Sequence, residues 1–254
     1  MAAVAAAVML AVVVGCGSRP TETVRLYAGA GLRPAVDELV EAFRAETGIE
    51  VLPDYDGSGV VITRAREDND ADLFMPGDVW YVDELHRRTG RVVSKTQVSW
   101  FVPVLIVAKG NPKGIRSLED LFRDDVRVGL GNAQACQVGR ISTKILKKSG
   151  LDRATLKDVK EADTVNLLGV WVKVREVDVA IVWDAIAANV ADDVDVIEIP
   201  RDRNIISSVV VALLNTSKNP GAAQQFIDFM TGPTGRDILR KRGYRVEPPD
   251  QPAS

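Results

Sequence analysis

The chain has 254 residues, of which 46% are hydrophobic and 26% charged, a composition typical of a folded protein. Its 32 basic and 35 acidic residues are spread along the sequence and leave a net charge of −3, with no basic stripe and no aromatic residues interleaved with Lys or Arg. Nucleic acid is therefore not an expected partner, and the length suffices for one large domain or for two lobes with separate cores.

The first residues, MAAVAAAVMLAVVV, form an uncharged apolar run that is too short to span a bilayer comfortably as a helix. Small and polar residues follow at once, which is the pattern of a secretory signal, whereas a buried N-terminal helix is the alternative. The residues VVGC, which end at Cys16, resemble a bacterial lipobox, in which the cysteine is lipidated. We expect a signal peptide over residues 1–15, a lipidated tether over 16–23, and a protein anchored through Cys16 that faces the periplasm or the cell exterior.

Strands and helices are predicted to alternate over the first part of the chain. The predicted strands cover residues 24–28, 49–55 and 71–78, and the predicted helices cover residues 32–47, 60–67 and 79–89. In the first helix, apolar residues recur at helical spacing, Pro34 lies in the first turn and Gly48 follows the end. This alternation indicates an α/β fold with a mainly parallel sheet.

Two long apolar stretches interrupt the alternation. In SWFVPVLIVAKGNPKGI, residues 99–115, we predict a long apolar strand with Pro103 inside it and a Gly-Asn-Pro turn after it. IISSVVVALLN, residues 205–215, is predicted to be a second long strand. Between them we expect strands at VRVGLGN and VDVAIVWDA and helices over residues 138–149 and 164–174; helices over 221–231 and 234–242 end the chain. Two α/β parts joined by two long strands indicate two lobes with a cleft between them.

Three glycine-rich turns lie where a predicted strand ends and a predicted helix begins: AGAG (28–31), DGSG (56–59) and GNAQACQVG (131–139). In an open α/β sheet, such turns lie at the carboxyl ends of the strands, where ligands bind. A helix N-terminus offers unpaired N–H groups and a partial positive charge, and glycine lets a ligand approach the backbone. The turns therefore predict an anion site made of backbone dipoles, although ordinary glycine-rich turns are the alternative.

The order of motifs from residue 24 to about 248 resembles that of the periplasmic molybdate-binding proteins of ABC importers. The motifs are LYAGAGLRPAVDELVEAFRAETGIEV, YDGSG, ADLFMPGDVWYVDEL, VLIVAKGNPKGI, VDVAIVWDA and FMTGPTGRDILRKRGYRV. The resemblance implies a two-lobed periplasmic-binding-protein-like α/β fold of type II, with mixed sheets and a cleft. Lobe I would comprise residues 24–102 and 209–247, lobe II residues 103–208, and residues 248–254 a flexible tail.

The resemblance also implies the function. It predicts a monomeric, extracytoplasmic solute-binding lipoprotein, not an enzyme and without a cofactor or metal ion. The protein would capture a tetrahedral oxyanion, molybdate or tungstate, and deliver it to an ABC permease.

Backbone N–H groups and hydroxyls hold the oxyanion in that family, which assigns the candidate site residues. Gly31 stands where the family has a serine and keeps only its N–H; Ser58 matches the middle serine of the second turn. Val165 would be a backbone donor, and Trp183, in place of a tyrosine, would offer an indole N–H. The third turn would supply its donor from Cys136, Gln137 or Val138. As an exposed turn hydroxyl, Ser58 is expected to contribute little to folding.

Other functions compete with molybdate binding. Asp56, beside the second turn, would repel a fully ionised anion but could accept a proton from phosphate, so a phosphate binder is the alternative that Asp56 raises. A sulfate-type binder of the same fold is a further alternative. Capping of the next helix by Asp56 is the simpler interpretation. An iron carrier would use paired tyrosines, which the sequence does not show. An enzyme is disfavoured because His86 is the only histidine and Cys136 has no base beside it.

Overall fold

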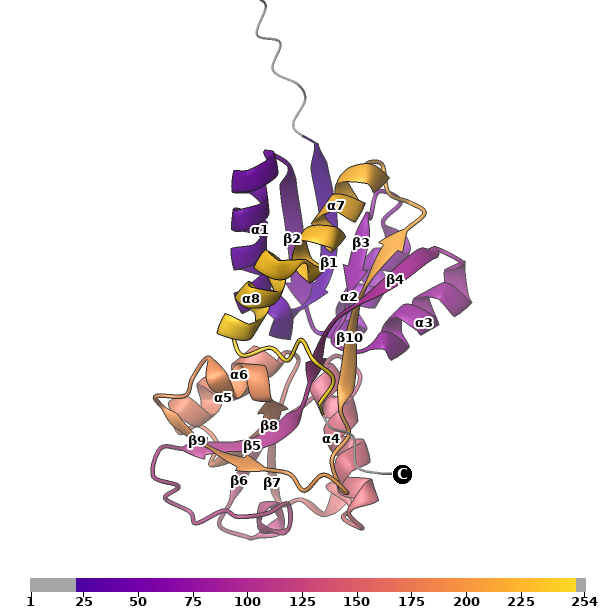
Figure 1. The fold of residues 1–254 in the computed structure, drawn as a ribbon. Coiled ribbons are helices and arrows are strands. Elements are labelled where there is room, and N and C mark those ends of the chain that lie inside the picture. Colours follow the sequence, from indigo (N-terminus) through magenta and orange to yellow (C-terminus); the bar gives the residue numbers. More distant parts are fainter. Residues whose placement is uncertain (1–21, 250–254) are drawn as a thin grey trace, which may run out of the picture.

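The computed structural model describes residues 22–249, which fold into two lobes that lie one above the other in Figure 1. Each lobe is built on a mixed five-stranded sheet with helices packed against it, which confirms the predicted α/β fold with two lobes. The predicted signal peptide, Cys16 and residues 250–254 lie outside the described residues. Within residues 22–249, no helix is long and apolar enough to cross a membrane.

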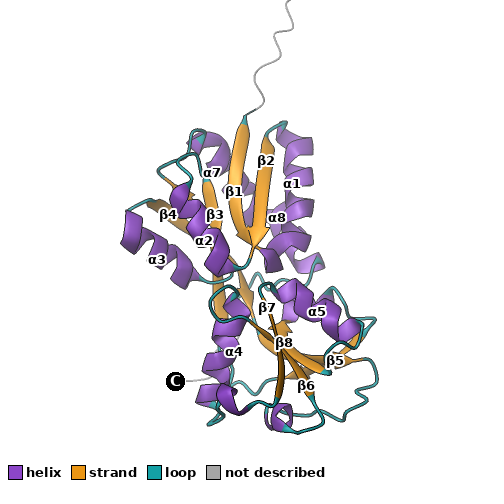
Figure 2. Ribbon diagram, turned by 180° about the vertical axis from the view of Figure 1, so that it is seen from behind, coloured by secondary structure: helices purple, strands orange, loops and turns teal. Residues whose placement is uncertain are grey.

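The upper lobe, here called lobe I, has its strands in the order β2-β1-β3-β10-β4. The strands are β1 (Thr23–Gly29), β2 (Glu50–Asp56), β3 (Leu73–Met75), β4 (Val92–Phe101) and β10 (Ser207–Leu214). β1 is parallel to β2 and β3, whereas β10 is antiparallel to β3 and β4. Figure 2 shows β1 and β2 running toward the lower lobe, so their carboxyl ends lie at the boundary between the lobes.

Helices cover both faces of the sheet of lobe I (Figures 1 and 2). α1 (Arg33–Thr47), α7 (Pro220–Thr231) and α8 (Pro233–Lys241) lie on one face, and α2 (Ser58–Glu67) and α3 (Val79–Thr89) on the other. Phe43 of α1 packs on Phe226 of α7 with the ring centroids 5.1 Å apart. On the opposite face, Val61 of α2 and Leu85 of α3 are fully buried. Burial of both faces explains why the inner strands β3 and β10 are mostly apolar.

The lower lobe, lobe II, has the strand order β7-β6-β8-β5-β9. Its strands are β5 (Pro103–Ala108), β6 (Arg127–Gly131), β7 (Asp158–Ala162), β8 (Val179–Trp183) and β9 (Val194–Glu198). β6 is parallel to β7 and β8, and β5 is antiparallel to β8 and β9. Its helices are α4 (Gln137–Lys148), α5 (Val165–Lys173) and α6 (Asp184–Ala188). Three short 3-10 helices complete the fold: η1 (Ala30–Leu32) in lobe I, and η2 (Glu119–Phe122) and η3 (Arg153–Thr155) in lobe II.

The chain crosses between the lobes where one long strand was predicted. β4 ends at Phe101 in the sheet of lobe I, and β5 starts at Pro103 in the sheet of lobe II, so the prediction of a single strand that continues through Pro103 is wrong. Proline lacks an N–H for the ladder, and here it is the first residue of a new strand. The chain returns to lobe I before Ser207. The N–H of Trp100 donates to the carbonyl oxygen of Arg245 at 2.9 Å. The segment around Arg245, near the C-terminus, is therefore a third segment at the boundary.

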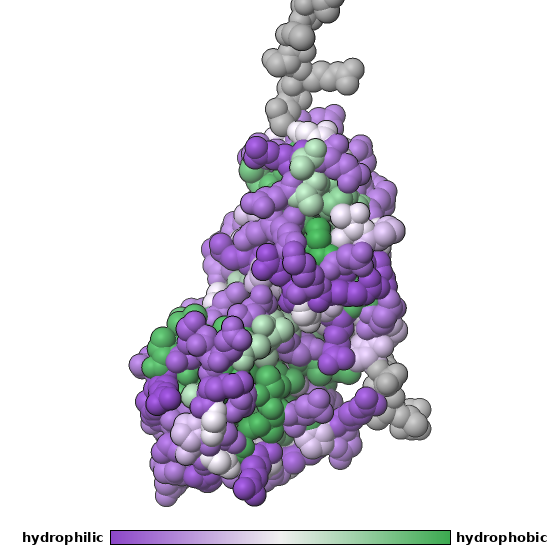
Figure 3. Space-filling model, turned by 60° about the vertical axis from the view of Figure 1, so that its left-hand side comes forward, coloured by the Kyte–Doolittle hydropathy of each residue, from purple (hydrophilic) through white to green (hydrophobic). Residues whose placement is uncertain are grey.

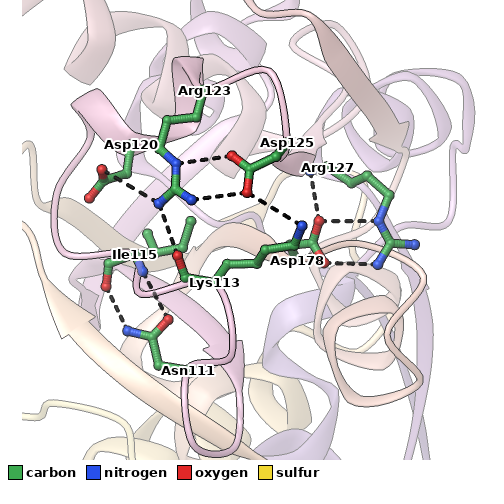
Figure 4. Close-up of polar contacts among 8 residues, drawn as sticks. All are labelled: Asn111, Lys113, Ile115, Asp120, Arg123, Asp125, Arg127 and Asp178. Carbon is green, nitrogen blue, oxygen red and sulfur yellow. Dashed lines mark hydrogen bonds and ion pairs between the residues drawn. The ribbon is translucent and has the colours of Figure 1, made fainter.

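Polar contacts join the residues of the loop between β5 and β6 to one another and to their neighbours (Figure 4). The side chain of Asn111 accepts from the N–H of Ile115 at 2.9 Å and donates to the carbonyl of the same residue at 2.7 Å. Arg123 pairs with Asp125, and Arg127 binds Asp178 through two nitrogens. Each of these charged side chains has its partner within the loop or directly beside it, and the ion pairs help to hold this part of lobe II together.

Most of the surface seen in Figure 3 is hydrophilic, and apolar residues gather on lobe II. Val170 of α5 is 48% exposed, Val174 just after α5 is 61% exposed, and Val196 of β9 is 49% exposed. Leu168 and Val172, on the inner side of α5, are fully buried. α5 therefore carries apolar side chains on both sides.

Candidate functional site

The carboxyl ends of strands from both lobes meet around one small cavity. It is lined by Gly29, Ala30, Gly31, Gly57, Ser58, Gly77, Phe101, Cys136, Gln137, Thr164, Val165 and Trp183. Gly29, Asp56, Ala162 and Trp183 are the last residues of β1, β2, β7 and β8, so the cavity occupies the position where open α/β sheets bind ligands. The space that the centre of a water molecule can occupy is about 20 Å³, somewhat more than one water needs. Only a small, compact ligand fits.

Three helices begin at this cavity. Ser58, Gln137 and Val165 are the first residues of α2, α4 and α5, and all three line it. The capping residues Gly57, Cys136 and Thr164 make no side-chain hydrogen bond to the helix that follows, so the first N–H groups are not capped in that way. Three helix N-termini thus bring partial positive charge, and N–H groups without a side-chain cap, to one place. The arrangement favours an anion.

None of the twelve lining residues carries a charge, and the neighbouring acidic residues Asp56 and Asp184 have their own partners. The carboxylate of Asp56 accepts from its neighbour Gly57 N at 2.8 Å and from Arg64 at 2.7 Å. Asp184 accepts from Val102 N at 3.2 Å and pairs with Arg245 at 2.6 Å. Burial raises the pKa of Asp184, while the pairing with Arg245 acts in the opposite direction. The anion site would therefore consist of dipoles, without a counter-cation.

An aromatic pair forms one wall of the cavity. Phe101, at the crossing between the lobes, stacks on Trp183 with an interplanar angle of 4° and ring centroids 4.9 Å apart. Both side chains are almost completely buried. Such a wall excludes water and strengthens the interaction of an anion with the surrounding N–H groups, because the local dielectric constant is low.

The side chain of Val165 explains why position 31 is a glycine. A Cβ added to Gly31 would lie 2.9 Å from Cγ1 of Val165 and 3.4 Å from Cδ1 of Trp183, so there is no room for a serine without displacement of a neighbour. Tyr244 donates from its hydroxyl to the carbonyl of Gly31 at 2.6 Å and fixes this peptide. The two departures from the family pattern, Gly31 and Trp183, therefore lie beside each other in the wall of the cavity.

Ser58 is not an exposed turn residue, as the sequence led us to expect, because only 3% of it is accessible. Its Oγ accepts a hydrogen bond from the N–H of Gly77 at 3.0 Å. The hydroxyl proton remains for donation into the cavity. The expectation that Ser58 contributes little to folding is wrong, because its loss would leave a buried N–H without a partner.

The glycine-rich turn that contains Ser58 faces the backbone of lobe II. The N–H of Gly59 donates to Ala135 O at 2.9 Å. A Cβ on Gly59 would lie 1.9 Å from Gln134 O, and a Cβ on Gly57 would lie 2.3 Å from Ala135 O. Both glycines are therefore required for the lobes to approach this closely. In the structure, the two lobes are in contact at this turn.

Cys136 lies in the third turn with its thiol buried. Burial raises the pKa of the thiol to about 11, although the N–H groups of Gly139, Val138 and Val165 point toward the sulfur and act to lower the pKa. Val138 is fully buried in the first turn of α4 and does not line the cavity.

The structure thus brings Gly31, Ser58, Cys136, Gln137, Val165 and Trp183 together in the wall of one cavity, but not Val138. Their role in ligand binding stays a prediction. Sequence reasoning missed Gly77, Phe101 and Thr164. Gly77 could have been found, because it follows the third strand in the MPGD segment, whereas Phe101 reaches the cavity only through the crossing between the lobes.

The features of an iron carrier or an enzyme do not gather here. None of the four tyrosines lines the cavity. The hydroxyls of Tyr27 and Tyr55 donate to Asp68 and Asp37, at 2.9 and 2.7 Å. Among residues 22–249, no group of three or more His, Cys, Asp or Glu side chains is placed to hold a metal ion.

Comparison with known proteins agrees with this geometry. Residues 24–245 match the model of the family described as bacterial extracellular solute-binding protein. The chain belongs to this family. A putative binding protein of Haemophilus influenzae is 32% identical to this solute-binding protein over 220 residues, 86% of this chain and 89% of the relative. A molybdate-binding protein of Mycobacterium tuberculosis is 28% identical over 254 residues, 94% of each chain, which confirms the resemblance seen in the sequence.

Among solved structures, the sulfate-binding protein SubI of M. tuberculosis superimposes on this solute-binding protein with a TM-score of 0.79 at 21% identity, covering 89% of this chain and 88% of that one. At this identity the likeness establishes the two-lobed fold and leaves the ligand open. The choice of ligand depends on the cavity.

Proposed function

We propose that this solute-binding protein captures a tetrahedral oxyanion, molybdate or tungstate, outside the cytoplasm and delivers it to an ABC importer. The observation that carries the proposal is the meeting of the N-termini of α2, α4 and α5 at a small, water-excluding cavity with no charged side chain in its wall. The similarity to a molybdate-binding protein over 94% of the chain supports the choice of anion.

Phosphate is the alternative that the sequence raised through Asp56. The carboxylate of Asp56 already accepts hydrogen bonds from Arg64 and from the N–H of Gly57, and Asp56 does not line the cavity. It is therefore not placed to accept a proton from bound phosphate. This supports molybdate or tungstate over phosphate, and it does not separate them from sulfate.

Thermal unfolding and titration calorimetry with molybdate, tungstate, sulfate and phosphate test the proposal. A ligand at a thousandfold excess over its dissociation constant adds about 4 kcal/mol to the free energy of unfolding. We expect this gain with molybdate and tungstate, and less with the other two anions. Stabilisation by phosphate or sulfate alone would reassign the ligand, and no stabilisation by any of the four anions would contradict oxyanion binding.

We further propose that the protein acts as a monomer, anchored to the membrane by a lipid on Cys16 so that it stays close to its permease. The apolar run that ends in VVGC supports the anchor. Cys16→Ala should release the protein from the membrane and leave anion affinity unchanged. If the variant stayed membrane-bound after a high-salt wash, the anchor would lie elsewhere.

A further inference from the structure

The side chain of Gln137 contains an unsatisfied polar atom in the wall of the cavity. Gln137 is 3% exposed, and its Oε1 is buried without a hydrogen-bond partner among the described residues. Its Nε2 lies 3.3 Å from Oγ of Ser207, the first residue of β10, which is fully buried. Buried side-chain oxygens of this kind nearly always have a partner in folded proteins, so the missing one calls for a physical cause.

The carboxamide can satisfy its groups in a second orientation. The oxygen and nitrogen of a glutamine amide are nearly equal in size, and a rotation of half a turn exchanges them. After that rotation, Oε1 accepts the hydroxyl proton of Ser207, and the NH₂ group takes the place of the unpaired oxygen. Ser207 fits both orientations because a hydroxyl both donates and accepts. Only the second orientation leaves no buried acceptor unpaired.

The position of Gln137 relative to Ser58 supports a role in the cavity. Both side chains border Gly77: a Cβ on Gly77 would lie 3.3 Å from Oγ of Ser58 and 3.5 Å from Cβ of Gln137. Ser58 belongs to lobe I and Gln137 to lobe II, so the two approach the same wall from opposite sides of the boundary.

We propose that the carboxamide of Gln137 contacts the bound anion as a side-chain donor and that Ser207 orients it. This inference rests on the proposed oxyanion function and extends it. With a fully ionised oxyanion, the NH₂ group donates to the ligand and Oε1 accepts from Ser207. Gln137 thereby supplies a side-chain donor in a site where Gly31 has none and Trp183 has only its indole N–H. An anion that carries no proton is the class that this orientation selects.

Two substitutions at position 137 separate the donor from the shape of the side chain. Gln137→Met keeps the length and removes the amide, and it should weaken molybdate binding roughly tenfold or more, because a hydrogen bond to a charged ligand is lost. Gln137→Glu should weaken binding further at pH 8, where a carboxylate faces the anion, and recover part of the affinity as the pH falls and the carboxyl becomes a donor. Gln224→Met, on an exposed part of α7, is the matched control and should bind like the wild type.

The side-chain amide protons report on the contact without relying on a variant. In a ¹⁵N-correlated NMR spectrum, the Gln137 side-chain signals, identified by their absence in Gln137→Met, should shift on saturation with molybdate. Ser207→Ala should weaken binding less than Gln137→Met does and should broaden these signals, because the amide loses its orienting partner.

Failure of the inference differs from failure of the proposed function. If the wild type binds molybdate but Gln137→Met binds within twofold of it, or if the Gln137 signals stay unmoved at saturation, Gln137 is not a contact and the inference is wrong. If the wild type binds none of the four oxyanions, both the function and the inference fall.

Discussion

Ser58 makes a hydrogen bond within the fold and also lines the cavity. Its Oγ accepts from the N–H of Gly77, a residue of the loop after β3, and its hydroxyl proton remains available to the cavity. The serine therefore joins two glycine-containing turns of lobe I and presents a donor to the space between them. The sequence identified the residue, but the contact with Gly77 depends on the folded arrangement of β2 and β3.

Ser58→Ala should reduce both anion affinity and stability. Loss of a hydrogen bond to a charged ligand costs roughly 1.5–3 kcal/mol of binding, and the N–H of Gly77 left without a partner costs about 1 kcal/mol or more of folding stability. Calorimetry with molybdate and chemical denaturation without ligand measure the two quantities. Unchanged affinity would mean that the hydroxyl serves only the turn.

Asp56→Asn tests whether the neighbouring carboxylate takes part in binding. The ion pair of Asp56 with Arg64 is partly exposed to solvent, and such pairs contribute little, so molybdate and phosphate affinities should both stay within about twofold of the wild type. Calorimetry with the two anions is the measurement. A selective loss of phosphate binding would show that the carboxylate reaches the ligand.

At the scale of elements, the sequence predicted the α-helices except the short α6, and it predicted the strands that carry an apolar run. It did not predict β7 and β9. Their sequences, DVKEA and VDVIE, place exposed polar residues on strands at the two edges of the lower sheet, so no apolar run marks them. The break at Pro103 was missed for the opposite reason. Apolar residues continue on both sides of it, although the two halves belong to different sheets.

Prediction of the candidate site from the sequence is also limited to local patterns. Local patterns predicted three glycine-rich turns before helices, and the structure places all three at the cavity. The partners of these turns across the boundary, such as Ala135 opposite Gly59, depend on how the lobes meet. Neither the aromatic wall nor the pairing of Gln137 with Ser207 leaves a signal within one element.

Gly59→Ala should prevent the start of α2 from meeting the third turn. The added Cβ would lie 1.9 Å from Gln134 O and 3.0 Å from its carbonyl carbon, so the backbones of the two lobes must separate. We expect molybdate affinity to fall at least tenfold, since the helix N-termini no longer converge. Gly221→Ala, at the start of α7 with no atom near the added Cβ, is the control. Small-angle scattering of both variants with molybdate should show a larger radius of gyration only for Gly59→Ala. An equal affinity of both variants would contradict the role of this contact.

At the scale of the whole molecule, contacts across the boundary lie on several sides of the cavity. The guanidinium of Arg140 in α4 lies 3.3 Å above the ring of Trp80 in α3, and Arg245 of the C-terminal segment pairs with Asp184 in α6. Together with the Gly59 contact, they hold the lobes in the arrangement that encloses the cavity. A ligand that binds both lobes favours this arrangement over one with the lobes separated. The size of the effect equals the difference in the ligand's binding free energy for the two arrangements.

Because Cys136 is buried, the rate at which its thiol is chemically modified can report how often the two lobes separate. In the enclosed form Cys136 is 4% exposed, and burial raises the pKa of its thiol to about 11, so we expect little thiolate at pH 8 and little access for a water-soluble disulfide reagent. Each reaction must therefore wait for the lobes to part, and in a Cys16→Ala background no other thiol competes.

The rate of thiol modification should then fall with molybdate concentration in proportion to the fraction of separated molecules. In Gly59→Ala, modification should be fast and almost independent of the anion. A wild-type rate that saturating molybdate does not change would mean that reagent reaches Cys136 without separation of the lobes. Where the rate does respond, it measures how often an empty carrier samples its open form, a quantity that equilibrium affinity alone cannot supply.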